Sequence, residues 1–130
     1  MNLEQQQKIV VEALEDVKGH EIQIFNTQPL TSLFDRVVIA SGTSNRQTRA
    51  LANEVIRKAR EYGLHIIAVE GESSGEWVLI DLGDIVVHCM QPAIRNYYQL
   101  EALWGDHPIS LASVHQTPLP TMVTTDKSNQ

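Results

Sequence analysis

The stretch ASGTSNR, residues 40–46, joins an apolar run to the start of a helical pattern and carries residue types that suit anion binding. The free N–H groups of a first helical turn can hold an anion, and Arg46 and Arg49 stand close by in the sequence. Enzymes that transfer nucleotidyl groups also need two or three carboxylates that hold Mg²⁺. The nearest pair, Asp81 and Asp84, flanks a turn and lacks the two-residue spacing that points two side chains to one face of a strand. The sequence therefore leaves open a plainly capped helix or, as the alternative, a nucleotidyltransferase-type enzyme with an atypical metal site.

The other residues with reactive side chains give no catalytic pattern. The five histidines lack metal-ligand spacing, and no serine occupies a nucleophile elbow. Cys89 is the only cysteine, which excludes an internal disulfide and fits a reducing compartment. We therefore predict no catalytic residue, no bound metal and no cofactor, and we interpret His88 as a packing or interface residue.

The segment EGESSGEWVLIDLGDIVVH, residues 70–88, predicts two strands joined through Leu82-Gly83. This turn would place Trp77 opposite His88. Side chains two apart share a face, so one face of the hairpin would be uniformly apolar and the other mixed. The apolar face would carry Val78, Ile80, Ile85, Val87 and Cys89, and the mixed face Trp77, Leu79, Val86, His88 and Met90. An aromatic residue within a polar rim is typical of a recognition surface, although a second layer of helices would explain the mixed face equally well.

Acidic residues gather in one part of the chain. The formal net charge is −6, and residues 70–106 contain seven acids and one base, whereas the remainder contains nine of each. This balance argues against broad binding to a nucleic-acid backbone, which requires a basic face. An acidic patch beside exposed apolar residues would suit a basic protein partner, and a merely solubilising surface is the simpler alternative.

The elements that must position these residues alternate between helical and extended patterns. The predicted order is helix 3–17, strand 21–27, strand 35–42, helix 43–63, strand 65–71, strands 76–81 and 84–89, and helix 92–104. The strand, helix and strand over residues 35–70 predict a parallel crossover, and the hairpin adds an antiparallel pair. The predicted fold class is therefore α/β, with a mixed sheet of roughly five strands and helices packed on it.

Residues 1–106 account for this pattern and are predicted to form one domain. Residues 107–130 are rich in Thr, Ser and Pro without sustained periodicity, so they are predicted to be a mobile tail, with a docked segment around 109–114 left open. No apolar run reaches the roughly 18 residues of a membrane span, and the N-terminus lacks the features of a signal peptide. We therefore predict a cytoplasmic protein that does not enter membranes.

Three blocks of the sequence together resemble the Iojap family, the ribosomal silencing factors. They are DRVVIASGTSNRQTRALA (35–52), VEGESSGEWVLIDLGDIVVHCM (69–90) and RNYYQLEALW (95–104). The resemblance implies a nucleotidyltransferase-like fold without catalytic carboxylates, in agreement with the missing carboxylate pair. It also implies a protein that is not an enzyme. Such a protein binds the large ribosomal subunit through ribosomal protein uL14, sterically blocks joining of the small subunit and represses translation under nutrient limitation.

The family's contact surface centres on the sheet around the tryptophan block. On this sequence the resemblance maps it to Trp77, Asp81, Leu82, His88 and Met90, with Glu70 at the rim. Ribosomal proteins are generally basic, which would explain the acidic residues between 70 and 106. A homodimer of the free protein is left open.

Overall fold

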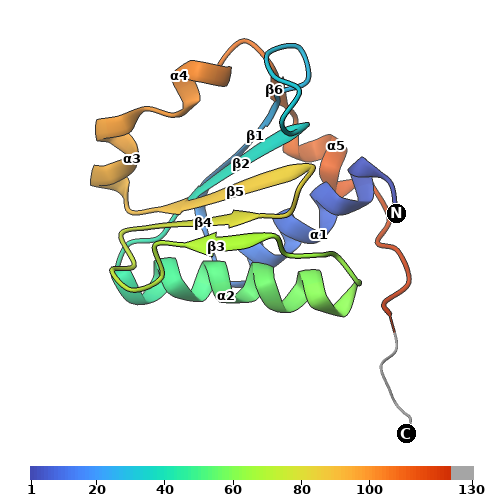
Figure 1. Ribbon diagram of the computed structural model, residues 1–130, viewed down its shortest axis with the longest axis horizontal. Coiled ribbons are helices and arrows are strands. Elements are labelled where there is room, and N and C mark those ends of the chain that lie inside the picture. The colour runs from blue at the N-terminus through green and yellow to red at the C-terminus, as the bar shows by residue number, and fades with distance from the viewer. Residues whose placement is uncertain (124–130) are drawn as a thin grey trace, which may run out of the picture.

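The computed structural model describes residues 1–123 and contains a six-stranded sheet with helices on both faces (Figure 1). The helices are α1 (Leu3–Asp16), α2 (Asn45–Glu61), α3 (Pro92–Tyr98), α4 (Glu101–Trp104) and α5 (Leu111–His115). The strands are β1 (His20–Asn26), β2 (Arg36–Ser41), β3 (Ala68–Glu70), β4 (Trp77–Asp81), β5 (Ile85–Met90) and β6 (Pro108–Ile109). The predicted α/β class is confirmed, with six strands in place of roughly five.

The strand order is β3-β4-β5-β2-β1-β6, in which β2 and β5 run parallel and the other neighbouring pairs run antiparallel. Helix α2 connects β2 to β3, which runs in the direction of β2 on the far side of the β4–β5 hairpin. This connection is the parallel crossover predicted over residues 35–70. The hairpin therefore lies inside the sheet, where helices can pack on either of its faces.

Helices α1 and α2 cover one face of the sheet (Figure 1). Both helices begin at side-chain caps: Asn2 Oδ1 accepts a hydrogen bond from the N–H of Gln5 at 2.8 Å, and Ser44 Oγ accepts one from the N–H of Gln47 at 3.0 Å. The core between helices and sheet includes Val10, Leu14, Leu51, Val55, Val78, Ile80, Ile85, Val87 and Cys89. Each large side chain fully buried in this way stabilises the fold by about 1.5–3 kcal/mol.

Helices α3 and α4 cover part of the opposite face. The single helix predicted over residues 92–104 is interrupted, because Gln99 adopts a left-handed conformation with φ +49°. The bend brings Trp104 edge-on to Phe34, with ring centroids 5.8 Å apart. Beneath this layer lie the buried side chains of Phe25, Val37, Ile39 and Met90. The rest of this face, over β3 and β4, carries partly exposed side chains.

The hairpin turn lies one residue later than the sequence predicted. The N–H of Leu82 donates to the carbonyl of Ile85 at 2.9 Å, so these two residues form the last pair before the turn. Gly83 and Asp84, which lie between them, therefore occupy the two turn positions. Gly83 has φ +90°, which the first position of a type II′ turn requires and which glycine adopts without strain. Leucine is unsuited to that position, so Leu82 becomes the last residue before the turn.

The cross-strand register moves with the turn. Trp77 faces Met90 and Leu79 faces His88, so the predicted pairing of Trp77 with His88 is wrong. The shift amounts to two residues along the partner strand. Because side chains alternate with a period of two, each paired residue keeps its predicted face.

The segment after Asp106 packs against the rest of the fold. Strand β6 pairs with β1 through Ile109, and Val114 on α5 is 1% exposed in the core under the sheet. The docked segment left open around 109–114 is therefore present, and a mobile tail does not begin directly after Asp106. Residues 124–130 of the predicted tail lie outside the described residues.

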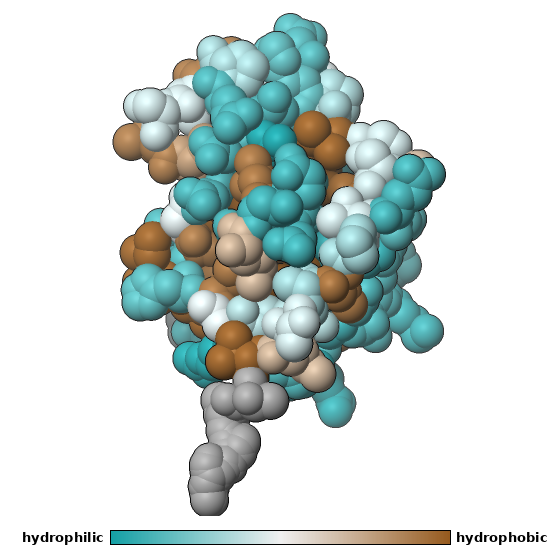
Figure 2. Space-filling view, turned by 90° about the vertical axis from the view of Figure 1, so that its right-hand side faces the viewer, coloured by the Kyte–Doolittle hydropathy of each residue, from teal (hydrophilic) through white to brown (hydrophobic). Residues whose placement is uncertain are grey.

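Hydrophobic surface is unevenly distributed over the molecule. Figure 2 shows the side that carries α5 and the N-terminus, where hydrophobic side chains form separate patches among hydrophilic ones. On α3 and α4, by contrast, Tyr97, Tyr98 and Leu103 are 80%, 53% and 62% exposed. Within residues 1–123, no helix combines the length and apolar character that crossing a membrane requires.

Candidate functional site

The partly covered face of the sheet brings together side chains from three strands. Residues directly opposite each other in neighbouring strands share a face, so Glu70 on β3, Leu79 on β4 and His88 on β5 form one row. Trp77 and Asp81 flank Leu79 on β4 with the same parity. We call these five residues the open face, since each is exposed or half-buried.

The side chain of Trp77 is held by a polar and an aromatic contact. Its Nε1–H donates a hydrogen bond of 3.0 Å to His88 Nδ1. Its ring lies 4.9 Å from that of Tyr98, which in turn lies 5.0 Å from the ring of Tyr97. Such aromatic pairs contribute about 0.5–1.5 kcal/mol beyond the burial of their area. A large aromatic side chain that is held in place and still partly exposed is suited to anchor a protein partner.

His88 is neutral at neutral pH. Burial lowers the pKa of its imidazole to about 4, because the charged form would lose its hydration. The hydrogen bond from Trp77 requires an unprotonated Nδ1, so the ring proton belongs on Nε2. The imidazole therefore serves as a hydrogen-bond acceptor within the sheet.

The loop between β3 and β4, residues 71–76, forms the border of the open face beside Trp77. Glu70, Gly71, Trp77 and Leu79 line a shallow hollow of about 350 Å³. Gly71 has φ +88°, and a Cβ there would lie 1.9 Å from the carbonyl oxygen of Trp77, so only glycine fits. Arg49 of α2 holds the loop from the other side by donating to the carbonyls of residues 72 and 73 at 2.9 and 2.7 Å.

Acidic side chains lie along one border of this face. Glu70 on β3 and Glu72 and Glu76 in the loop before β4 are exposed, whereas Asp84 in the hairpin turn accepts a hydrogen bond from Gln6 of α1 on the opposite side of the sheet. The one base of residues 70–106, Arg95, is buried in an ion pair and does not offset them. Part of the acidic excess seen in the sequence, Glu70, Glu72 and Glu76, therefore lies at the surface beside the open face.

The structure brings together four of the six predicted contact residues and separates two. Glu70, Trp77, Asp81 and His88 share the open face. Leu82 is 8% exposed in the core beneath α1 and α2, because the turn begins after it. Met90 has the predicted parity but is 0% exposed, because α3 and α4 cover its end of β5. These two residues are corrected from contact residues to core residues.

Sequence reasoning missed Tyr98 as a member of the site. The residue lies on α3, outside the hairpin, and reaches Trp77 because α3 folds back over the end of β5. Two consecutive tyrosines near the end of an amphipathic helix were the available signal, since one helix cannot turn both towards the core.

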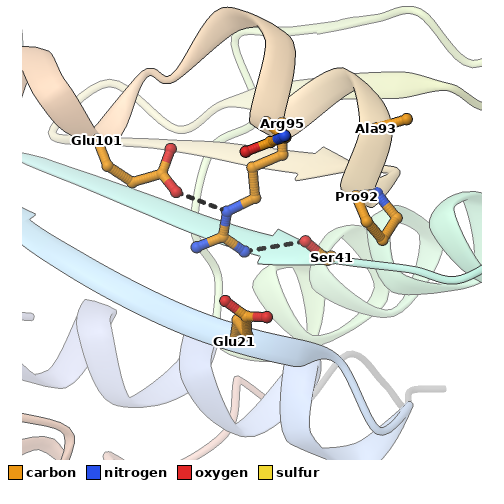
Figure 3. Close-up of a pocket in the computed structure, with 7 residues that line it drawn as sticks. Glu21, Ser41, Pro92, Ala93, Arg95 and Glu101 are labelled. Carbon is orange, nitrogen blue, oxygen red and sulfur yellow. Dashed lines mark hydrogen bonds and ion pairs between the residues drawn. The ribbon is translucent and has the colours of Figure 1, made fainter.

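A polar hollow of about 400 Å³ lies where α3 meets the ends of β1 and β2 (Figure 3). Arg95, 6% exposed, donates to Glu101 Oε2 at 2.9 Å, to Ser41 Oγ at 3.0 Å and to Gln23 Oε1 at 2.8 Å. Glu21 points into the same hollow from β1 (Figure 3). A buried guanidinium with three acceptors on three elements fixes α3 and α4 to the sheet. It thereby holds Tyr98 beside Trp77.

The residues considered for catalysis are not assembled. Asp81 ends β4 and Asp84 lies in the hairpin turn, next to Arg36, the first residue of β2. Helix α2 begins beyond Ser41, the last residue of β2. The two places are roughly 17 Å apart along six-residue strands. Asp81 accepts a hydrogen bond from the N–H of Gly83 at 2.8 Å. Among residues 1–123, no three His, Cys, Asp or Glu side chains form a group that could hold a metal ion.

The thiol of Cys89 is a core group. It is 0% exposed, and burial raises its pKa to about 12, so it is not a nucleophile at neutral pH. This agrees with the predicted place of Cys89 on the apolar face of the hairpin.

Comparison with known proteins identifies one family. The family model described as "Ribosomal silencing factor during starvation" matches residues 1–130. The ribosomal silencing factor of Chromobacterium violaceum is 53% identical over 112 residues, covering 86% of this chain and 92% of that protein. The ribosomal silencing factor of Bacillus subtilis is 36% identical over 110 residues, covering 85% and 93%.

Organelles contain more distant relatives, and solved structures share the fold. A mouse protein named "Mitochondrial assembly of ribosomal large subunit protein 1" is 28% identical over 99 residues, covering 74% of this chain and 43% of that protein. A crystal structure of a Chromobacterium violaceum protein superposes with a TM-score of 0.80 at 54% identity, covering 81% of this chain and 88% of that one. A Bacillus halodurans structure gives 0.71 at 36% identity, covering 78% and 93%.

Proposed function

This chain belongs to the family of ribosomal silencing factors, and from that premise we propose that it binds the large ribosomal subunit, sterically blocks joining of the small subunit and represses translation under nutrient limitation. The action requires no catalysis, because a folded domain seated on the joining face of one subunit excludes the other. The site of action in this proposal is the cytoplasm, where bacterial subunits join.

The open face is the proposed contact surface, and the observation that carries this is the environment of Trp77. The indole is half-buried, hydrogen-bonded to His88 and packed against a tyrosine that is itself 53% exposed. Central aromatic anchors of this kind commonly dominate the binding energy of protein interfaces. The exposed acids around it favour a basic partner, and ribosomal protein uL14 is the partner we propose.

The test is cosedimentation of the purified protein with isolated ribosomal subunits. We expect it to pellet with large subunits and not with small subunits, and to reduce the formation of joined ribosomes when it is added before mixing. Equal binding to both subunits, or to neither, would refute the proposal.

A matched pair of variants locates the surface in the same assay. Trp77→Ala should weaken large-subunit binding about thirtyfold, the effect of losing an anchor worth about 2 kcal/mol. Met122→Ala is the control, because Met122 is also hydrophobic and is 52% exposed. Its neighbour in sequence, Val123, contacts α2, so Met122 lies away from the open face. The Met122→Ala variant should therefore bind large subunits as the unaltered protein does. Equal affinity for both variants would place the contact elsewhere.

A further inference from the structure

We propose that His88 is a positioning residue for partner binding: by accepting the indole N–H of Trp77, it fixes the orientation in which the partner meets that ring. The inference rests on the function proposed above and concerns the same open face. It changes the role of His88 from a residue that touches the partner to one that acts through Trp77.

The geometry of the hairpin supports this role. Trp77 and His88 are diagonal neighbours on β4 and β5, because Trp77 pairs with Met90 and His88 lies two residues before Met90 on the same strand. This diagonal separation is within reach of two aromatic side chains. The bond from Nε1 to Nδ1 is 3.0 Å long, and the two ring centroids lie 5.9 Å apart. It engages the single polar atom of the indole. Together with the ring of Tyr98 at 4.9 Å, it restricts both side-chain torsions of Trp77.

Packing alone does not account for an imidazole at this position. His88 lies directly beside the apolar side chains of Leu79 and Val86, where an aliphatic side chain or a phenyl ring would be buried without loss of hydration. What histidine adds is an acceptor for the indole N–H, a group that usually finds a partner when it is buried. Glu70 and Asp81 are the carboxylates on the same face, and neither forms a salt bridge with the imidazole.

A fixed ring orientation affects binding through preorganisation. A partly exposed indole that samples several rotamers must be ordered when the partner binds, and that ordering lowers the affinity. Restricting the ring beforehand should therefore raise the affinity by about five- to tenfold, the effect of one immobilised side chain.

Two substitutions separate positioning from packing. His88→Phe keeps a ring of similar size and removes the acceptor, whereas His88→Asn places a carbonyl oxygen near the position of Nδ1. Per folded molecule, we expect His88→Phe to bind large subunits about five- to tenfold more weakly and His88→Asn to stay within about threefold of the unaltered protein. Melting curves give the folded fraction of each variant.

The indole N–H signals in nuclear magnetic resonance report directly on the hydrogen bond from Trp77. If His88 only filled space, its replacement by phenylalanine would leave the signal of Trp77 unchanged. The chain has two tryptophans, and Trp77→Phe identifies which of the two signals belongs to residue 77. In His88→Phe that signal should shift and exchange faster with water, whereas in His88→Asn it should stay near its original position. The signal of Trp104 should not change.

The outcomes distinguish this inference from the proposed function. If Trp77→Ala loses binding and His88→Phe does not, positioning by His88 is refuted and the proposed function stands. If both His88 variants lose binding equally while the indole signal of Trp77 is unchanged, His88 touches the partner directly and the inference is again wrong. If Trp77→Ala itself binds normally, the contact surface fails and the inference fails with it.

Discussion

The two faces of the β4–β5 hairpin are formed by alternate residues of the same two strands, but different elements cover them. On the face beneath α1 and α2, Val78, Ile80, Val87 and Cys89 are each 0% exposed. On the opposite face, four side chains at alternate positions stay exposed or half-buried: Trp77, Leu79, Asp81 and His88. The first face is sealed by two long helices, whereas the second is covered by the short α3–α4 layer at one end. In the proposed function, stability and partner binding thus belong to opposite parities of the same strands.

The largest effect that tests this division should come from the sealed face. Ile80→Ala removes part of a completely buried side chain from the core, and such changes cost about 2–5 kcal/mol in the free energy of unfolding. We expect a much lower melting temperature, with large-subunit binding per folded molecule unchanged. Urea unfolding and cosedimentation on the same preparations measure the two quantities.

Trp77→Ala is the matched change on the other parity. It should weaken large-subunit binding per folded molecule and leave the free energy of unfolding nearly unchanged. If instead Trp77→Ala unfolds the domain while the folded fraction binds normally, the indole belongs to the core. The assignment of the two faces would then be wrong.

The face of the hairpin on which each side chain lies could be predicted from the sequence, because an error of two residues in register does not change it. Placing the turn at Leu82-Gly83 moved every partner by two residues, and a shift of two leaves each side chain on its face. The exception is Leu82 itself, whose role depends on which residue occupies the turn. Parity therefore placed Trp77, Leu79 and His88 on one face correctly, whereas the pairing of Trp77 with His88 was wrong. Glu70 and Asp81 were assigned to the contact surface by the family resemblance and not by the parity of the hairpin.

The parts that could not be predicted depend on contacts remote in sequence or on single backbone torsions. The break between α3 and α4 rests on one left-handed residue, Gln99, where no glycine or proline marks a bend. That break folds α4 over the end of β5 and buries Met90. Strand β6 has two residues, too few for any periodicity to be read.

A smaller effect should show how far the sealed core extends towards the C-terminus. Val114 on α5 is 1% exposed and belongs to the core cluster of α1, α2 and the sheet. Val114→Ala should lower the free energy of unfolding by about 1–2 kcal/mol, since it removes two buried methyl groups. Binding to large subunits should be unchanged, because α5 lies apart from the open face. Calorimetric melting measures the loss, and a Tm equal to that of the unaltered protein would mean that α5 docks without contributing to stability.

The smallest effect concerns the pH dependence of stability. It tests whether the imidazole of His88 is shielded from water on the open face. Burial lowers the pKa of the folded protein's imidazole to about 4, below the ordinary value of 6.5. Well above pH 6.5 the ring is neutral in both the folded and the unfolded chain, so His88 adds no pH dependence there. As the pH falls from 6.5 towards 4, the unfolded chain takes up a proton that the folded chain does not, and the folded state loses stability.

At pH 5.5 this loss should amount to about 1 kcal/mol relative to pH 7.5. His88→Phe removes the titrating group and leaves every other one in place. Between pH 7.5 and pH 5.5 the unaltered protein should therefore lose about 1 kcal/mol more of its unfolding free energy than the variant does. Urea unfolding of both proteins at the two pH values isolates the contribution, because the two chains differ only at residue 88. A difference that stays constant between pH 7.5 and 5.5 would show that His88 titrates equally in the folded and unfolded chains. The imidazole would then be hydrated, and this part of the hairpin would be as open to water as the acidic loop beside it.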